Sequence, residues 1–459
     1  MKNHATMIPQ WIGVKKDWHL ESNDPLEHLI ELPPQVQKTH VYAIGATGAG
    51  KTNLLHHMQA QDIERSHSIV AFDSRGDLVD AVLELAAGRV DPSLVTLIDL
   101  REKQNPHGFD PLYGPGEPYF RALGVLDAVA NESDSWGIQL AESLRFALML
   151  FAEVGEPITR LDQLFYDASF RLQCLAKAEA SPVTGFWERF NALSIEKQHA
   201  LAMPVLNKLS ILTSTPALRK VLGHPNPIDL GKQLNTAGSI TLISLAVDEL
   251  HGAAKMMGNM ILASVTREIF ARVQIPEHQR NPVRIYVDEF ENFVLKEFDS
   301  LLAEGRRFAA SLVLAHQTLA QLTPRFRSMI LGNVGVKFAF RAGREDSQTL
   351  CKDLTGDPKL YDLNNLATGE ALMWVRGQGE VLIEVNEPLL HSTGWLSPEG
   401  REFRQAILDT RSHVEVCDFD DDDDPFDEPQ LVNIHLPTEP KYLLASGTKH
   451  QPLEDWLCS

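Results

Sequence analysis

The chain has 459 residues, of which 44% are hydrophobic, so it is long enough for two or three globular domains. Its four cysteines form no C-x-x-C pair, which argues against a zinc site or a disulfide framework and fits a reducing compartment. No stretch approaches the roughly 18 uninterrupted apolar residues of a membrane span, and no signal peptide is evident. We therefore expect a cytoplasmic protein without direct membrane insertion, which reaches the inner membrane only through partners.

The first strong signal lies at residues 45–52. Residues 1–37 form a lead-in, an apolar strand is predicted at 40–44, and a helix is predicted at 53–63. Between them lies a complete G-x-x-x-x-G-K-[ST] pattern, whose glycines let backbone N–H groups wrap a phosphate at a helix N-terminus. A chance glycine-rich turn is the alternative. The expected nucleotide-binding residues are Gly45, Thr47, Gly48, Ala49, Gly50, Lys51, Thr52 and Asn53, with Lys51 on the β- and γ-phosphates of ATP and Thr52 on Mg²⁺.

An α/β pattern follows and is then interrupted. Strands are predicted at 68–73 and 95–100, with a helix at 78–87 that Asp77 would cap. Prolines and glycines between 106 and 118 mark a boundary. Residues 117–225 show helical periodicity, for example Leu140, Leu144 and Phe151, and we expect an inserted all-α subdomain there. A structural cap without a ligand is the other interpretation of this insertion.

The core resumes with a strand at 239–245, a helix at 247–273 and a strand at 284–289 that ends in two carboxylates. Ligands bind at the carboxyl ends of parallel strands, so we expect Asp288 to hold Mg²⁺ through water and Glu289 to activate the attacking water. The next strand, 311–317, ends in Gln317, which would sense the γ-phosphate or would simply be a surface residue. A strand at 334–340 and a hairpin at 371–385 complete a core that spans 38–116 and 226–411.

These ordered motifs resemble the motor domain of type IV secretion (conjugative) coupling proteins, within the HerA/FtsK group of hexameric P-loop ATPases. The matching stretches are GATGAGKTNLL at 45–55, FDSRGDL at 72–78, PVLNKLSIL at 204–212, IDLGKQL at 228–234, VDEFENF at 287–293, EGRRFAASLVLAHQTLAQL at 304–322 and GNVGVKFAFRAGREDSQTL at 332–350. The resemblance implies a RecA-like α/β fold with a parallel central sheet, and the catalytic Glu289 on the strand next to the P-loop strand. It also implies a homo-oligomeric, hexameric ring with ATP between subunits and DNA in the channel.

An arginine finger that reaches across the subunit interface is a further implication of the resemblance. The arginines in matching motifs are Arg306, Arg307, Arg341 and Arg344, and we select Arg307 and Arg344 as catalytic candidates. Such fingers contribute roughly 10³–10⁵ in rate in other systems. For each arginine, a surface cation or a phosphate contact is the alternative role.

The C-terminal segment, residues 412–459, differs from the rest in charge. The whole chain has a formal net charge of −20, and this segment contains twelve acidic residues against two lysines. Half of the net charge therefore lies in the tail, and DNA binding through basic channel loops is compatible with the remainder. Dense acidic runs such as Asp420–Asp424 repel themselves, so we expect a disordered tail that either binds a partner or only solvates the chain.

Three functional hypotheses follow from the sequence. The first is an ATP-driven DNA motor that resembles a conjugative coupling protein and translocates DNA to or through a type IV secretion system. The second is a HerA-like ring that acts as a scaffold or motor in a DNA-processing or defence complex. The third assigns recruitment of a protein substrate to the helical insertion. Relaxosome or secretion-system proteins are the expected partners of the insertion or the acidic tail.

Overall fold

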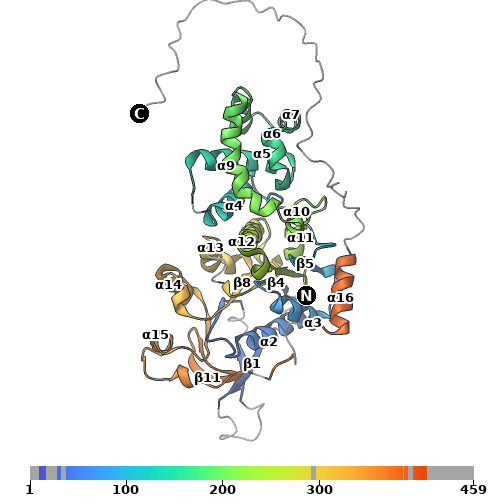
Figure 1. Ribbon diagram of the computed structural model, residues 1–459. Helices are drawn as coiled ribbons and strands as arrows, with labels where there is room; N and C mark the ends of the chain where they lie inside the picture. Colours follow the sequence, from blue (N-terminus) through green and yellow to red (C-terminus); the bar gives the residue numbers. More distant parts are fainter. Residues whose placement is uncertain are drawn as a thin grey trace, which may run out of the picture. The chain divides into compact units, whose positions relative to one another are not determined.

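The computed structural model describes residues 10–16, 28–32, 38–133, 135–290, 296–385, 387–390 and 396–410. These residues form an eleven-stranded sheet with helices on both faces (Figure 1) in the order β2-β1-β11-β10-β9-β3-β8-β7-β4-β6-β5. The strands from β9 to β5 in this order are parallel, and β10, β11, β1 and β2 extend the sheet antiparallel. The strands are β1 (Gln10–Lys15), β2 (Leu29–Leu32), β3 (Val41–Ile44), β4 (Ser68–Asp73), β5 (Val95–Asp99), β6 (Ile240–Ser244), β7 (Val283–Asp288), β8 (Ala310–His316), β9 (Val336–Ala339), β10 (Glu370–Val375) and β11 (Gly379–Val385).

Both faces of the parallel strands are buried, because alternate residues face two different hydrophobic clusters. Val41 and Ala43 of β3 pack with α2 and α3, whereas Tyr42 and Ile44 pack in the cluster that contains α12 and α13. Strands that are buried on both faces read as continuous apolar runs, which explains why the sequence identified them. The helices around the sheet are α2 (Lys51–Glu64), α3 (Asp77–Ala86), α12 (Val247–Ala271), α13 (Lys296–Glu304), α14 (Pro324–Asn333), α15 (Arg344–Thr355) and α16 (Pro398–Asp409).

The chain between β5 and β6 is helical, as the periodicity predicted. Its helices are α4 (Pro118–Asn131), α5 (Ile138–Val154), α6 (Leu161–Tyr166), α7 (Ala168–Lys177), α8 (Pro182–Asn191), α9 (Ile195–Thr213), α10 (Pro216–Leu222) and α11 (Leu230–Asn235). Helix α4 packs directly on α12, and a Cβ atom at Gly124 would lie 3.0 Å from that of Ala263. Buried side chains of α4–α11 belong to the same hydrophobic cluster as α12 and one face of the sheet. The helical segment therefore shares its core with the α/β part.

The structure confirms the RecA-like α/β class and the order of the predicted core elements, and it corrects two details. Strand β8 lies between β3 and β7, so Glu289 is not on the strand next to the P-loop strand. The residue that caps α3 is Asp73 rather than Asp77, because its carboxylate accepts the N–H groups of Leu78 and Val79 at 2.6 and 3.0 Å. The lead-in also contributes β1 and β2, which the sequence analysis did not predict.

Three further predictions concern the cysteines, membrane-spanning helices and the acidic tail. Cys174 and Cys351 are buried free thiols. None of the helices among the described residues is both long and apolar enough to cross a membrane. The predicted acidic tail, residues 412–459, lies outside the described residues.

Candidate nucleotide site

The loop between β3 and α2 has the backbone shape that its glycines allow. Gly48 and Gly50 have φ of 72° and 114°, a region that favours glycine. Two backbone hydrogen bonds hold the loop to neighbouring segments. The N–H of Ala46 donates to the carbonyl of Arg341 at 2.7 Å, and the N–H of Gly369 donates to the carbonyl of Ala49 at 3.0 Å. A Cβ atom at Gly50 would lie 3.0 Å from the Gly369 nitrogen, so the close approach also requires glycine. The loop is therefore fixed by the ends of β9 and the approach to β10.

Helix α2 begins at Lys51, and its N-cap residue Gly50 supplies no side-chain cap. The ammonium group of Lys51 is buried against the loop and donates to the carbonyls of Gly45 and Ala46 at 2.7 and 3.2 Å. Thr52 follows at the helix start, where the helix dipole favours an anion. The predicted phosphate-binding residues of 45–53 thus form one continuous loop and helix N-terminus.

A chain of hydrogen bonds joins this loop to the ends of β8, β7 and β4. The hydroxyl of Thr47 donates to Gln317 Oε1 at 3.2 Å, and Gln317 Nε2 donates to Glu289 Oε1 at 3.2 Å. The other carboxylate oxygen of Glu289, Oε2, accepts from the Ser74 hydroxyl at 2.9 Å. The structure therefore brings the predicted Thr47, Gln317 and Glu289 together and adds Ser74, which the sequence analysis did not select.

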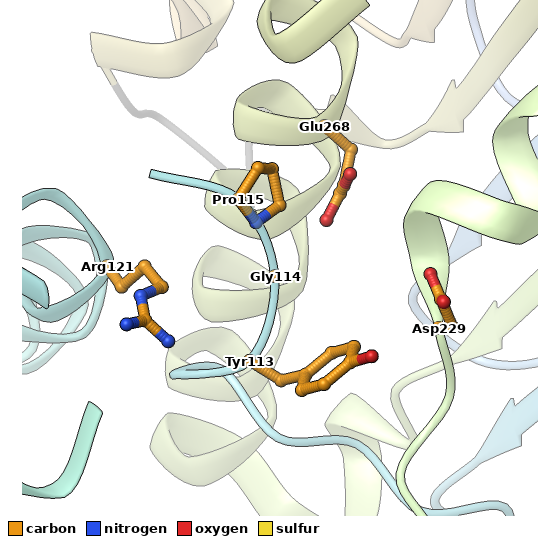
Figure 2. A pocket seen from close by; sticks show the side chains of 6 residues that line it. All are labelled: Tyr113, Gly114, Pro115, Arg121, Asp229 and Glu268. Carbon is orange, nitrogen blue, oxygen red and sulfur yellow. The ribbon is translucent and has the colours of Figure 1, made fainter. Parts of the chain in front are cut away.

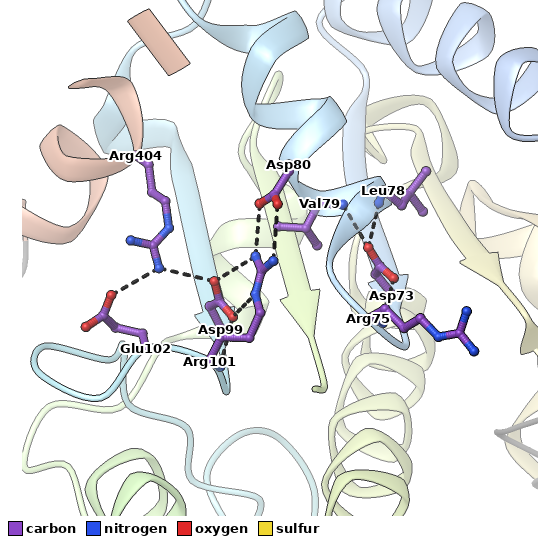
Figure 3. Close-up of polar contacts among 9 residues, drawn as sticks. All are labelled: Asp73, Arg75, Leu78, Val79, Asp80, Asp99, Arg101, Glu102 and Arg404. Atoms are coloured by element: carbon purple, nitrogen blue, oxygen red, sulfur yellow. Dashed lines mark hydrogen bonds and ion pairs between the residues drawn. The ribbon is translucent and has the colours of Figure 1, made fainter. Parts of the chain in front are cut away.

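Negative charge accumulates where a divalent cation is expected. Burial, together with the nearby carboxylates of Asp73 and Glu289, raises the pKa of Asp288 to about 7, against the opposing effects of the Glu289 backbone N–H and of Lys51. Burial also raises the pKa of Asp73, although its carboxylate accepts backbone N–H groups at the start of α3 (Figure 3). A cation beside these carboxylates would relieve their repulsion, and the oxygens of Asp288 and Thr52 are hard donors of the kind Mg²⁺ prefers.

The donor set suits a magnesium ion that is shared with phosphates. Within the described ranges, no group of three or more His, Cys, Asp or Glu side chains is arranged to hold a metal ion. Mg²⁺ usually retains waters and takes one or two protein carboxylates together with substrate phosphates, so it does not need such a group. Asp288 and Thr52 therefore fit the magnesium ion that the sequence predicts.

The four arginine candidates separate into two positions. Arg341 and Arg344 follow β9, and α15, which begins at Arg344, is tied to the end of β8 because Asp346 accepts the Thr318 hydroxyl at 2.7 Å. Both arginines thus lie at the edge of the sheet that carries the P-loop.

Arg306 and Arg307 lie instead before β8, in the 3-10 helix Gly305–Phe308 (η8), and both are exposed. At about 3.3 Å per residue, the length of β8 places them roughly 20 Å from the end that carries Gln317. An arginine there cannot reach the phosphate site of its own chain.

The sequence analysis missed two features of the site: the left-handed backbone conformation of Glu289 and the contact that Ser74 makes with it. Glu289 has φ of 50°, a left-handed conformation that costs a residue other than glycine roughly 1–2 kcal/mol. Ser74 lies in the FDSRGDL stretch, directly after a strand, and that position was the available signal. Without the order of the strands, its contact with Glu289 could not be derived.

A pocket of about 330 Å³ lies apart from the P-loop, where the loop after β5 meets α4, α11 and α12 (Figure 2). It is lined by Tyr113, Gly114, Pro115, Arg121, Asp229 and Glu268. The carboxylate of Glu268 points into it, and only 8% of this residue is exposed. Burial, with a smaller contribution from Asp229, raises the pKa of Glu268 to about 7, while the cations Arg267 and Arg272 oppose the shift.

A network of charged residues holds α16 against β5 and α3 (Figure 3). Arg404 donates to Asp99 and Glu102 at 3.2 and 3.0 Å. Arg101 donates to Asp99 Oδ1 and to Asp80 Oδ1, each at 2.9 Å, and so joins β5 to α3. Burial favours the neutral form of Asp99, but its hydrogen bonds and ion pairs with the arginines outweigh burial and lower its pKa. This network joins the last described helix to the nucleotide-binding fold.

The parallel sheet, the loop at residues 45–52 and the carboxylates opposite it define a RecA-like P-loop NTPase fold. Two family models match the sequence: one for the DNA-binding domain of type IV secretion-system coupling proteins, over residues 28–86, and one for the TraM recognition site of TraD and TraG, over residues 282–360. Within the P-loop class, both matched models come from type IV secretion coupling proteins, and the chain is similar to that family over these two stretches.

Solved structures agree with this fold. The bacterial conjugative coupling protein TrwBdeltaN70, in an unbound form, aligns over 78% of this chain and 87% of its own, with 16% identity and a TM-score of 0.57. Plasmid coupling protein TrwB in complex with ADP and Mg²⁺ aligns over the same shares, with 15% identity and a TM-score of 0.58. VirB4 of Thermoanaerobacter pseudethanolicus aligns over 85% and 97%, with 13% identity and a TM-score of 0.54. No curated protein matches the sequence.

Proposed function

We propose that the protein is an ATP-hydrolysing DNA motor that recruits DNA to a type IV secretion system. The carrying observation is the hydrogen-bonded chain from Thr47 through Gln317 to Glu289, because it joins the phosphate loop to a carboxylate that can act as a base. The matched coupling-protein models and the nucleotide complexes of similarly folded TrwB support the same assignment.

Each residue has a distinct role in the proposed reaction. Lys51 exchanges its contacts with loop carbonyls for the β- and γ-phosphates, while Thr52 and Asp288 hold the magnesium ion. A bound magnesium ion supplies charge neutralisation on the transferring phosphoryl group. Glu289 accepts a proton from the attacking water, and Gln317 orients that water and links its position to Thr47.

The proposed assembly is a hexameric ring in which a neighbour completes each site. Arg307 suits a finger in trans, since it is exposed and lies at the opposite end of β8 from its own phosphate site. Arg344 begins α15 at the P-loop edge, which suits a contact with nucleotide in its own subunit or an interface role. DNA in the channel and relaxosome proteins on the helical segment are the proposed partners, and the TraM recognition match at 282–360 supports a protein partner.

The test measures ATP hydrolysis by the full chain without DNA, with single-stranded DNA and with double-stranded DNA. Hydrolysis that DNA stimulates and that Lys51→Ala abolishes would support the motor. Glu289→Gln should bind ATP but lose hydrolysis, and a wild-type rate in this variant would overturn the assignment of the base. A slow rate that ignores DNA would favour the HerA-like scaffold instead.

A further inference from the structure

Ser74 contacts two parts of the molecule at once. Its hydroxyl donates to Glu289 Oε2 at 2.9 Å, and its backbone carbonyl accepts the N–H of Val247, the first residue of α12, at 2.8 Å. The adjacent Asp73 carbonyl accepts the N–H of Leu245 at 3.0 Å, and Arg75 pairs with Asp248 at 3.3 Å. The loop after β4 and the start of α12 are therefore bonded together and should move together.

The start of α12 is strained on both sides. Ala246, its N-cap residue, has φ of 51° and ψ of 47°, and His251 has φ of 45° and ψ of −116° inside the helix. These two residues isolate the first turn, 247–250, from the rest of α12. Positive φ is uncommon outside glycine and concentrates at sites that switch between arrangements. Glu289, at the other end of the same hydrogen-bonded path, shares this strain.

The far side of this turn faces the helical segment. Gly252 follows the strained His251, and a Cβ atom there would lie 3.4 Å from Ile211 Cδ1 of α9 and 3.9 Å from the Glu132 carboxylate after α4. Helix α12 also packs along α4 and α9. A shift of α4 or α9 would therefore reach the segment beside the strained turn directly, as well as the body of α12.

We propose that Ser74 is a positioning residue that restrains Glu289 and connects it to helices α4 and α9 through the first turn of α12. The inference rests on the proposed function, in which Glu289 is the base. The order of the strands gives its direction: β4 lies on the side of β7 away from β8 and β3. The Ser74 hydroxyl therefore holds Oε2 of Glu289 on the side away from the P-loop, while Gln317 holds Oε1. Movement of the turn frees Oε2, so that the carboxylate can turn toward the attacking water.

The test compares ATP hydrolysis by Ser74→Ala, Ser74→Thr and the wild-type chain, with and without DNA. Loss of a hydrogen bond to a charged group corresponds to about tenfold in rate, so Ser74→Ala should raise the basal kcat by about this factor. Its KM for ATP should change little, and its stimulation by DNA should fall toward onefold. Ser74→Thr keeps the hydroxyl and should restore the wild-type basal kcat and the wild-type stimulation by DNA. Ser311→Ala removes a buried serine at the other end of β8 and serves as the control.

Ala246→Gly tests the second half of the path. Glycine accepts the positive φ of this position, so the variant should fold at least as well as the wild type and should respond less to DNA. If Glu289→Gln is inactive while Ser74→Ala matches the wild type with and without DNA, the inference fails and the proposed function stands. If Glu289→Gln hydrolyses ATP normally, the proposed function of Glu289 fails and the inference fails with it. Equal behaviour of folded Ser74→Thr and Ser74→Ala would also overturn the role of the hydroxyl.

Discussion

The buried carboxylate of Glu268 should make the stability of the protein depend on pH, and replacement by glutamine should remove this dependence. The side chain lies on α12 and points into the pocket of Figure 2, with 8% of the residue exposed. A Cβ atom at Gly114 or Gly231 would lie 2.6 Å from one of its carboxylate oxygens, so two backbone segments approach the carboxylate closely while the pocket beside it stays open to solvent. Burial raises its pKa from the ordinary 4.5 to about 7.

The sign and size of the effect follow from linkage. The folded state binds the proton more tightly than the unfolded state, so this contribution is complete below about pH 4.5 and is lost as pH rises through about 7. At roughly 1.36 kcal/mol for each unit of pKa, the upper limit is about 3 kcal/mol. The pocket is open to solvent, which screens the charge, and we expect about 1–2 kcal/mol.

The assay is urea unfolding of the wild type and Glu268→Gln at pH 5 and pH 8. From pH 5 to pH 8 the wild type should lose about 1–2 kcal/mol more of its free energy of unfolding than the variant does. Glu277→Gln, in an exposed 3-10 helix, is the matched control and should show no such gain. Equal differences between Glu268→Gln and the wild type at both pH values would refute the reasoning.

Three further changes test the loop, the strand end and the last helix. Gly50→Ala places a Cβ atom 3.0 Å from the Gly369 nitrogen at a φ of 114°, so binding of a fluorescent ATP analogue should fall at least tenfold, whereas unaltered binding would contradict the close approach. Asp73→Ala removes the acceptor for the N–H groups at the start of α3 and should lower the free energy of unfolding by about 1–3 kcal/mol, as thermal denaturation would measure. Arg404→Ala leaves Asp99 and Glu102 with one cation fewer, so amide hydrogen exchange should accelerate in α16 while α12 keeps its protection. An exchange rate in α16 equal to that of the wild type would show that the apolar face of α16 is enough to hold this helix in place.

The sequence was sufficient for the parts of the site that depend on local pattern. The P-loop follows from its glycines and Lys51, and β4 and β7 follow from apolar runs that are buried on both faces. Asp288 and Gln317 could be placed at strand ends because parallel strands present their carboxyl ends at one edge.

The features that the sequence did not predict depend on pairing between segments that are far apart in the chain. The insertion of β8 between β3 and β7 depends on contacts between segments that are far apart in the chain, which no local pattern specifies. The strands of the lead-in were missed because β1 and β2 are antiparallel additions at the edge, where only one side needs apolar residues. Ser74 was missed for the same reason as the order of the strands, since its role exists only when β4 lies beside β7.

The position of the helical segment in the chain has a consequence for folding kinetics. Val95 of β5 pairs with Ile240 of β6, and every helix from α4 to α11 lies between these two strands in sequence. Closing so long a loop before its helices condense is entropically unfavourable, so the sheet should complete late. Substitutions that weaken α4 should then slow refolding and lower the yield of native protein, even where they touch neither nucleotide nor partner.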